Sequence, residues 1–244
     1  MKSLLQNKVK KIESIGKDAA GRPATDYNEW IDVFPEKNEL VKTTRNGQNV
    51  GKEMLRFDAS NKLINMETME DGINSSTTYS YNEKQQLIKV ATLSKDPING
   101  LDIEDVLIWE YKDTDLPIGL LKISNKTDTL HYLFVIENNK VVEEQLLRGK
   151  QVRDRIYYYY NESNRISDIV RYNKYVKKLM PDIMLEYNES NQVIQKVTLL
   201  TLQRSADYLI WRFVYNEKGL KTKEALFNKN KELQGKIDYT YTFY

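Results

Sequence analysis

One short segment recurs along this chain and constrains its fold more than any other feature. Each copy has a large apolar or aromatic residue, four polar residues, a spacer and a branched aliphatic residue. The copies read FPEKNEL from Phe34, FDASNKL from Phe57, YNEKQQL from Tyr81, IENNKVV from Ile136, YNESNRI from Tyr160, YNESNQV from Tyr187 and FNKNKEL from Phe227. Two variants, YKDTDLP from Tyr111 and YNEKGLK from Tyr215, carry the aliphatic residue one position earlier. Apart from the final short step, the copies start 23 to 30 residues apart, which is the scale of one β-hairpin with its return turn.

The polar residues of each copy indicate a particular turn. Asn or Asp at the first turn position can accept a hydrogen bond from the backbone two residues further on. The fourth position holds residues that adopt a left-handed backbone at low cost, namely Asn38, Asn61, Asn164, Asn191 and Gly219. Gln85 and Lys140 fit this position less well.

A type I turn followed by a left-handed residue forms a three-residue hairpin loop with a bulge. In that loop the first residue of the segment pairs with the seventh. We therefore predict that Phe57 pairs with Leu63, Tyr81 with Leu87, Tyr160 with Ile166 and Tyr187 with Val193.

The strands between the turns alternate apolar and polar residues, as in Leu209, Trp211, Phe213 and Tyr215. The predicted fold class is all-β: a tandem antiparallel β-hairpin meander, resembling a YD-repeat array, with about eighteen short strands. Residues 1–244 are expected to form a single repeat-array domain. Its hairpins turn near 35–38, 58–61, 82–85, 112–115, 137–140, 161–164, 188–191, 216–219 and 228–231.

The width of such a sheet bears on how it buries its apolar face. Eighteen strands at a spacing of about 4.8 Å would extend about 86 Å from edge to edge. Closed into a round barrel, they would leave a lumen too wide for Tyr and Leu side chains to fill. We therefore expect a large coiled or folded-over sheet.

Composition excludes several kinds of chemistry. The chain has no cysteine, so disulfides, thiolate metal sites and thiol nucleophiles are excluded. The net charge of +2 gives no general preference for nucleic acid or anionic membranes. The terminal segment IDYTYTFY has the wrong alternation for lipid-facing strands, and no apolar run has the length of a membrane helix, so no membrane span is expected.

The segment [YF]-[ND]-x-x-[GN]-x-[LIV] resembles the YD repeats of bacterial Rhs-like proteins. The nearest matches are YSYNEKQQLIKV at 79–90, YYYNESNRISDIV at 158–170 and FVYNEKGLKTKEA at 213–225. Large members of that family form a β-sheet shell around a toxin, and shorter arrays occur in exported bacterial proteins and lipoproteins. The resemblance therefore implies an extracytoplasmic protein, periplasmic or a surface lipoprotein whose leader is absent from this sequence, with a cytoplasmic location left open.

Candidate ligand-binding residues gather in RYNKYVKKLMPD. Arg171, Lys174, Lys177 and Lys178 alternate there with Tyr172 and Tyr175. Basic residues beside aromatic rings can bind an anionic polymer or lipid headgroups. Trp30 is a further candidate because acidic residues surround it and its ring could stack on a ligand.

No set of residues forms a recognisable catalytic or metal-binding pattern. His131 is the single histidine, and no carboxylate pair stands out. We expect a non-catalytic binding or scaffold protein without a cofactor or metal, whose partner is a protein or a glycan. The alternatives are a carbohydrate-binding or carbohydrate-active module using sheet aromatics, and an anionic-polymer binder through residues 171–178, although nucleic acid is disfavoured. The sequence leaves the oligomeric state open.

Overall fold

The computed structural model describes residues 1–24, 27–97, 99–200 and 207–244. Within them a short helix α1 (Lys2–Gln6) precedes the first strand, and a 3₁₀ turn η1 (Pro35–Lys37) joins β2 to β3. The strands are β1 (Val9–Asp18), β2 (Tyr27–Phe34), β3 (Glu39–Asn46), β4 (Asn49–Phe57), β5 (Leu63–Glu70), β6 (Ile73–Tyr81), β7 (Leu87–Asp96), β8 (Leu101–Glu110), β9 (Gly119–Ser124), β10 (Asp128–Glu137), β11 (Lys140–Arg148), β12 (Gln151–Tyr160), β13 (Ile166–Asn173), β14 (Lys178–Tyr187), β15 (Val193–Leu200), β16 (Asp207–Tyr215), β17 (Lys221–Phe227) and β18 (Leu233–Phe243).

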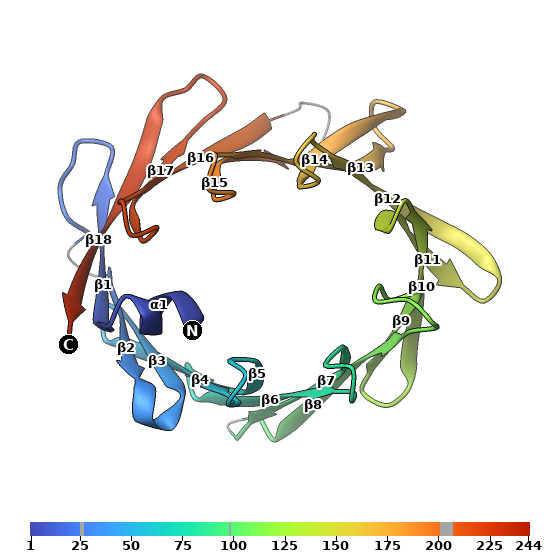
Figure 1. Ribbon diagram of the computed structural model, residues 1–244, viewed down its shortest axis with the longest axis horizontal. Coiled ribbons are helices and arrows are strands. Elements are labelled where there is room, and N and C mark those ends of the chain that lie inside the picture. Colours follow the sequence, from blue (N-terminus) through green and yellow to red (C-terminus); the bar gives the residue numbers. More distant parts are fainter. Residues whose placement is uncertain (25–26, 98, 201–206) are drawn as a thin grey trace. The chain divides into compact units, whose positions relative to one another are not determined.

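Each strand pairs with the next one along the chain in a single 18-stranded sheet (Figure 1). The registers determined between consecutive strands are antiparallel, from β2–β3 through to β17–β18. The predicted all-β antiparallel meander is therefore confirmed.

The first strand also pairs with the last. β1 pairs with β2, with Lys11 opposite Asp32, and it pairs with β18 as well. Beside this pairing, the backbone N–H of Tyr244 donates to the carbonyl of Lys8 at 2.9 Å. The order of pairing is therefore circular, and the expectation of a coiled or folded-over sheet is wrong. Pairing β1 with β18 satisfies the backbone N–H and C=O groups that two edge strands would leave without partners. This gain in hydrogen bonds is separate from the question of whether side chains fill the space inside the sheet.

The turns follow the predicted chemistry. All four predicted pairs are present: Phe57–Leu63, Tyr81–Leu87, Tyr160–Ile166 and Tyr187–Val193. Each lies beside a bulge in the register, and the fourth turn position has a positive φ, for example 62° at Asn61 and 61° at Asn191. The first turn position accepts backbone hydrogen bonds, as Asp58 does from Ser60 at 2.8 Å. Local turn chemistry therefore sets the register of these hairpins.

Several turns depart from the expectation: Phe34 pairs with Glu39 instead of Leu40, and no described residue between Glu110 and Gly119 has a positive φ. Gln85 adopts the left-handed conformation with φ 65°, although its side chain gives no particular preference for it. In the segment from Ile136, Asn138 and Asn139 both have positive φ, and Lys140 already begins β11. That loop is a two-residue hairpin of the type that favours Asn at both central positions, so the three-residue loop expected there is wrong.

The tyrosine that begins a copy ties its hairpin to the preceding one. The Tyr187 hydroxyl donates to the carbonyl of Ile166 at 2.9 Å, where Ile166 is the aliphatic residue of the preceding copy. Four other tyrosines bond in the same way to the carbonyl that follows the preceding turn: Tyr81 to Leu63, Tyr111 to Leu87, Tyr160 to Val141 and Tyr215 to Val193. The repeated aromatic residue is therefore a link between neighbouring hairpins as well as a packing group.

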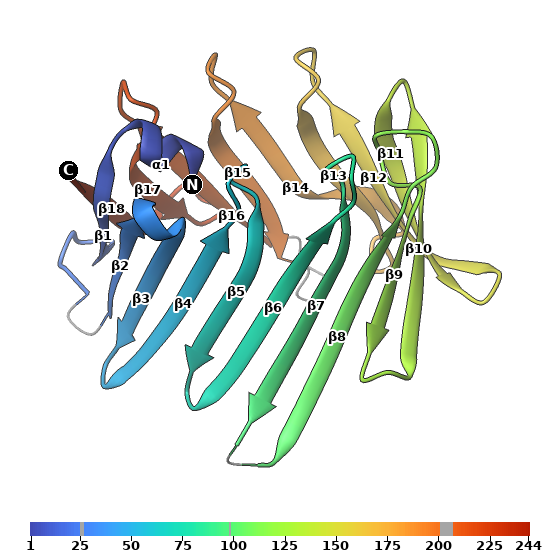
Figure 2. The same cartoon turned by 60° about the horizontal axis from the view of Figure 1, so that its bottom comes forward.

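Contacts between the Cα atoms divide the chain into two compact units. Unit 1 comprises Met1–Gly16, Pro23–His131 and Tyr239–Tyr244, and unit 2 comprises Lys17–Arg22 and Tyr132–Asp238. In unit 1, Val9 and Val33 are fully buried, and Figure 2 shows β2 to β8 side by side with their turns at the strand ends. In unit 2, Val170, Ile210 and Leu220 are buried. The single-domain expectation stays a prediction.

Candidate functional site

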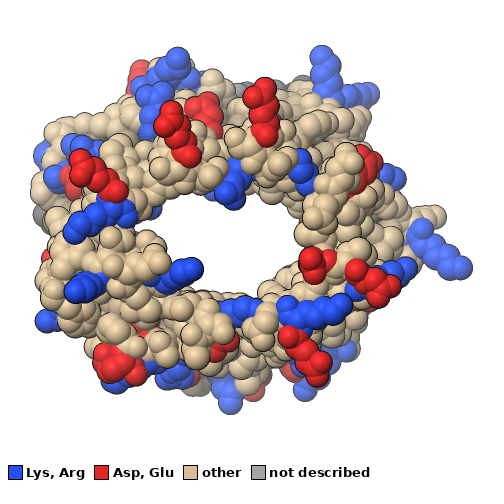
Figure 3. Space-filling view, in the orientation of Figure 1, with Lys and Arg blue, Asp and Glu red and all other residues tan. Residues whose placement is uncertain are grey.

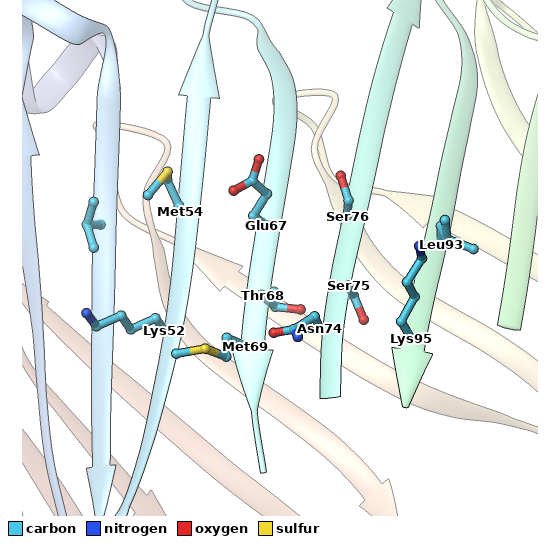
Figure 4. Close-up of a pocket in the computed structure, with 11 residues that line it drawn as sticks. Lys52, Met54, Glu67, Thr68, Met69, Asn74, Ser75, Ser76, Leu93 and Lys95 are labelled. Atoms are coloured by element: carbon cyan, nitrogen blue, oxygen red, sulfur yellow. The ribbon is translucent and has the colours of Figure 1, made fainter. Parts of the chain in front are cut away.

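Unit 1 contains a hollow on one face of β3 to β7. It encloses about 440 Å³, and the side chains shown in Figure 4 line it. Its apolar wall consists of Val41, Met54, Met69 and Leu93. The strand between the walls, β6 (INSSTTYSY), presents the short side chains of Asn74 and Ser76 to this face. The hollow therefore exists because a strand with short side chains runs between strands with long ones.

The register of the strands arranges these residues in two rows. One row runs Lys52, Met69, Asn74 and Lys95 across β4 to β7. The other runs Val41, Met54, Glu67, Ser76 and Leu93. Three strand spacings separate the backbones of Lys52 and Lys95, which is about 14 Å. The hollow thus has a lysine on either side and apolar side chains between them.

The acidic residue of the hollow, Glu67, has a basic partner, whereas the two lysines have no acidic partner among the described residues. Glu67 accepts a hydrogen bond from Arg56 at 2.8 Å, so its charge is balanced. Within the described residues, neither Lys52 nor Lys95 forms an ion pair, although Asp102 is opposite Lys95 in β8. Both lysine side chains are exposed. The hollow therefore offers positive charge next to apolar surface.

The residues predicted as ligand-binding lie mostly around a second pocket, in unit 2. Arg171, Tyr172, Lys174 and Tyr175 line this pocket of about 650 Å³. Asp154, Asp182 and Thr198, which sequence reasoning did not single out, line it too. Strand pairing brings Asp154 and Asp182 to Arg171, because β13 lies between β12 and β14.

Arg171 is not available as a free cation. Its guanidinium lies 3.2 Å from a carboxylate oxygen of Asp182 and 3.7 Å from one of Asp154. Lys177 and Lys178 do not line the pocket and lie exposed at the same turn. The predicted residues of this segment are therefore divided between a pocket with paired charges and an exposed turn.

The other candidates lie in unit 1. Trp30 is half-buried in β2, and Lys11 Nζ lies 5.8 Å from the centre of its ring. His131 Nε2 lies 3.9 Å from a carboxylate oxygen of Glu110, a pair that is charged only when the imidazole is protonated. The structure does not bring Trp30 or His131 into the hollow.

A buried tyrosine hydroxyl is the most strongly perturbed group described. Tyr158 donates a hydrogen bond to Glu144 at 3.0 Å. Burial, and next the nearby charge of Glu144, raise the pKa of Tyr158 well above its ordinary value. A tyrosine hydroxyl is protonated at neutral pH even at its ordinary pKa, and the raised pKa of Tyr158 extends this to higher pH, so the group remains a hydrogen-bond donor to Glu144.

Potential metal ligands are dispersed in the part of the chain that the structure describes. Acidic and basic side chains are both scattered over the face seen in Figure 3. Among the described residues, no three His, Asp or Glu side chains gather in a way that could hold a metal ion. No described helix has the length and apolar character needed to cross a membrane.

Sequence reasoning missed the hollow of unit 1. Its signal is present in the sequence, since INSSTTYSY has short polar side chains where the neighbouring strands carry Met69 and Leu93. The signal can be read only once the register places those residues opposite one another.

No protein-family model matches this chain, and no curated protein matches it. Among solved structures, it is similar to a porin-like protein from Bacteroides uniformis, with 10% identity and a TM-score of 0.49 over 96% of this chain and 98% of that one. It is also similar to the TcdB2–TccC3 complex (12% identity, TM-score 0.37) over 90% of this chain and 12% of that one. For the Photorhabdus luminescens Tc holotoxin pore, the identity is 12% and the TM-score 0.34, over 88% of this chain and 15% of that one. The chain thus spans a small part of the chains in these last two structures.

Proposed function

We propose that this chain is a non-catalytic binding protein whose hollow in unit 1 takes a small amphiphile with an anionic head and an apolar tail. One observation carries the proposal: two lysines without an ionic partner among the described residues flank a wall of Met54, Met69 and Leu93. Pockets for small ligands are typically of about 300–1,000 Å³, mostly apolar with a few polar groups that orient the ligand. The binding role and an extracytoplasmic location, as the YD-repeat resemblance implies, are compatible with such a ligand.

The energies involved give a moderate affinity. Removing about 150 Å² of apolar ligand surface from water contributes about 4 kcal/mol. A hydrogen bond to a charged group adds about 1.5–3 kcal/mol. The sum is about 5.5–7 kcal/mol before the cost of association is subtracted, so the dissociation constant can be no lower than roughly 10 micromolar.

The test compares three ten-carbon amphiphiles by isothermal titration calorimetry: decanoate, decan-1-ol and decyltrimethylammonium. We expect decanoate to bind best and decyltrimethylammonium worst, because Lys52 and Lys95 repel a cation. The double variant Lys52→Gln/Lys95→Gln should bind decanoate about tenfold or more weakly, the loss of one charged hydrogen bond. Lys89→Gln is the matched control, since Lys89 is exposed on β7 but does not line the hollow.

A second variant tests the apolar wall separately. Ser76→Leu puts a branched side chain into the floor of the hollow and should abolish binding of decanoate and decan-1-ol alike. Ser76 is exposed, so the variant should remain folded, which circular dichroism checks. Equal binding of all three amphiphiles, or decanoate binding unchanged in both variants, would contradict the proposed function.

A further inference from the structure

Two return turns of unit 2 are exposed, and together they are here called the basic rim. It consists of residues 148–153 (RGKQVR) and 172–179 (YNKYVKKL). β12 and β13 are antiparallel neighbours, with Ile156 opposite Arg171, so the start of β12 lies at the same end as the end of β13. The pairing of β12 with β13 ends at Ile156 and Arg171, so the two turns are separate hairpin ends on the same side of the sheet. Sequence reasoning identified the second turn but not the first.

The basic rim has one sign of charge. It carries six basic residues and no acidic one: Arg148, Lys150, Arg153, Lys174, Lys177 and Lys178. All six are exposed, and none has an ion pair among the residues that the structure describes. Asp154, which follows Arg153 in the sequence, and Asp182 are both paired with Arg171. A chain with a net charge of +2 therefore carries six unpaired basic residues on these two turns.

Large apolar side chains are exposed among these charges. Tyr172 is 50% exposed, Tyr175 65% and Leu179 51%. Val152 and Val176 are also exposed, at 37% and 41%. Exposed aliphatic and aromatic side chains cost free energy in water and become favourable when a partner covers them.

We propose that the basic rim docks on the surface of a membrane that contains anionic phospholipids. Lysine and arginine are attracted to acidic headgroups, and Tyr is favoured at the headgroup level because its ring is apolar and its hydroxyl polar. Val152, Val176 and Leu179 would enter the outer part of the hydrocarbon. A nucleic acid would bind the lysines through its phosphates and the tyrosines by base stacking. It would leave the three aliphatic side chains exposed to water, because only aromatic rings stack on bases. The membrane is therefore the partner that accounts for both kinds of residue.

The experiment measures sedimentation of the full chain with vesicles of phosphatidylcholine, with and without about 30% phosphatidylglycerol. Binding is expected only to the anionic vesicles, and it should fall steeply at about 1 M salt, where the Debye length is about 3 Å. Each lysine near such a surface contributes about fivefold in partition coefficient. The variant Lys174→Gln/Lys177→Gln/Lys178→Gln should therefore bind about 100-fold more weakly.

Two further variants separate the alternatives. Lys84→Gln/Lys112→Gln/Lys231→Gln removes the same number of exposed charges from other turns and should bind within about twofold of the original chain. Val176→Ser/Leu179→Ser keeps every charge and should lose about tenfold or more on anionic vesicles. The last measurement adds heparin or single-stranded DNA to the protein and tests whether either one binds it and displaces it from anionic vesicles.

Each outcome either supports membrane docking or overturns it. Weak binding to anionic vesicles in the two rim variants, with the control unchanged, supports membrane docking. Equal loss in the control variant means general electrostatic attraction and overturns it. Tight DNA or heparin binding that the Val176→Ser/Leu179→Ser variant retains, with no vesicle binding, assigns the rim to a polyanion instead. The hollow of unit 1 plays no part in any arm, so this inference is independent of the proposed function.

Discussion

At the residue scale, the tyrosine that opens a copy has two tasks. Tyr187 lies opposite Val193 across the ladder, and its hydroxyl donates to the backbone carbonyl of Ile166 in the previous hairpin at 2.9 Å. Phe34, Phe57 and Phe227 occupy the same position without a hydroxyl and so cannot make the second contact. The preference for tyrosine over phenylalanine in this chain therefore has a structural reason.

Replacing Tyr187 with Phe isolates the hydroxyl. We expect the free energy of unfolding to fall by about 1 kcal/mol, because the carbonyl of Ile166 loses its side-chain donor while the ring stays in place. Urea denaturation measures the change. Tyr159→Phe is the control, since Tyr159 is 50% exposed and should change stability by less than about 0.5 kcal/mol. Equal effects of the two substitutions would mean that the link between hairpins carries no energy.

At the element scale, each three-residue hairpin loop depends on one residue with a left-handed backbone. Gly219 and Asn164 adopt that conformation at low cost, with φ of 72° and 60°. Gln85 adopts it as well, with φ 65°, although a glutamine side chain makes the left-handed conformation more costly. Lys62 of the preceding turn donates to the backbone carbonyl of Gln85 at 2.5 Å, and Gln192 donates in the same way to Gly219 at 2.9 Å. Neighbouring turns therefore support one another, and a poor turn residue is tolerated.

Gln85→Asn should raise the free energy of unfolding by about 0.5–1 kcal/mol, because Asn tolerates the left-handed conformation better. The bond from Lys62 is to the backbone and is unaffected. The reciprocal change, Asn61→Gln, should lower stability by a similar amount. Thermal unfolding followed by circular dichroism measures both, and changes of the same sign in the two variants would contradict the turn model.

The hairpins could be predicted from the sequence, whereas the sites could be predicted only in part. Asp58, Asn164 and Asn191 fix turns through bonds within a few residues, so their effect is visible locally. The hollow needs Met69, Asn74 and Lys95 to meet across three strands, which depends on every intervening register. Tyr175 and Lys177 were identified from composition, but the role of Asp154 and Asp182 in holding Arg171 was not, because both lie on other strands.

At the scale of the whole molecule, the pairing of β1 with β18 distinguishes this sheet from an open one. Besides the backbone pairing, Lys17 on β1 donates to Asp238 on β18 at 2.7 Å, and this bond lowers the pKa of Asp238. The Tyr244 hydroxyl donates to the carbonyl of Val33 at 2.7 Å. The closure joins residues more than 200 positions apart, so no local pattern could have indicated it.

Hydrogen–deuterium exchange tests the closure directly. If β1 and β18 pair, amides of Val9–Asp18 and Leu233–Phe243 should exchange as slowly as those of central strands such as β6 and β14. In an open sheet, alternate amides of the first and last strands would face water and exchange faster by orders of magnitude. Mass spectrometry of peptides from the four strands gives the comparison. Fast exchange confined to β1 and β18 would refute the circular pairing.

Circular pairing also changes what chain order means in this molecule. Because β1 has a neighbour on each side, no strand is the first or the last as far as hydrogen bonds are concerned. A permuted gene that joined Tyr244 to Met1 through a short linker and opened the chain at Asn125–Lys126 would encode the same set of neighbours. Folding would then start from a different pair of ends and reach the same ring of strands.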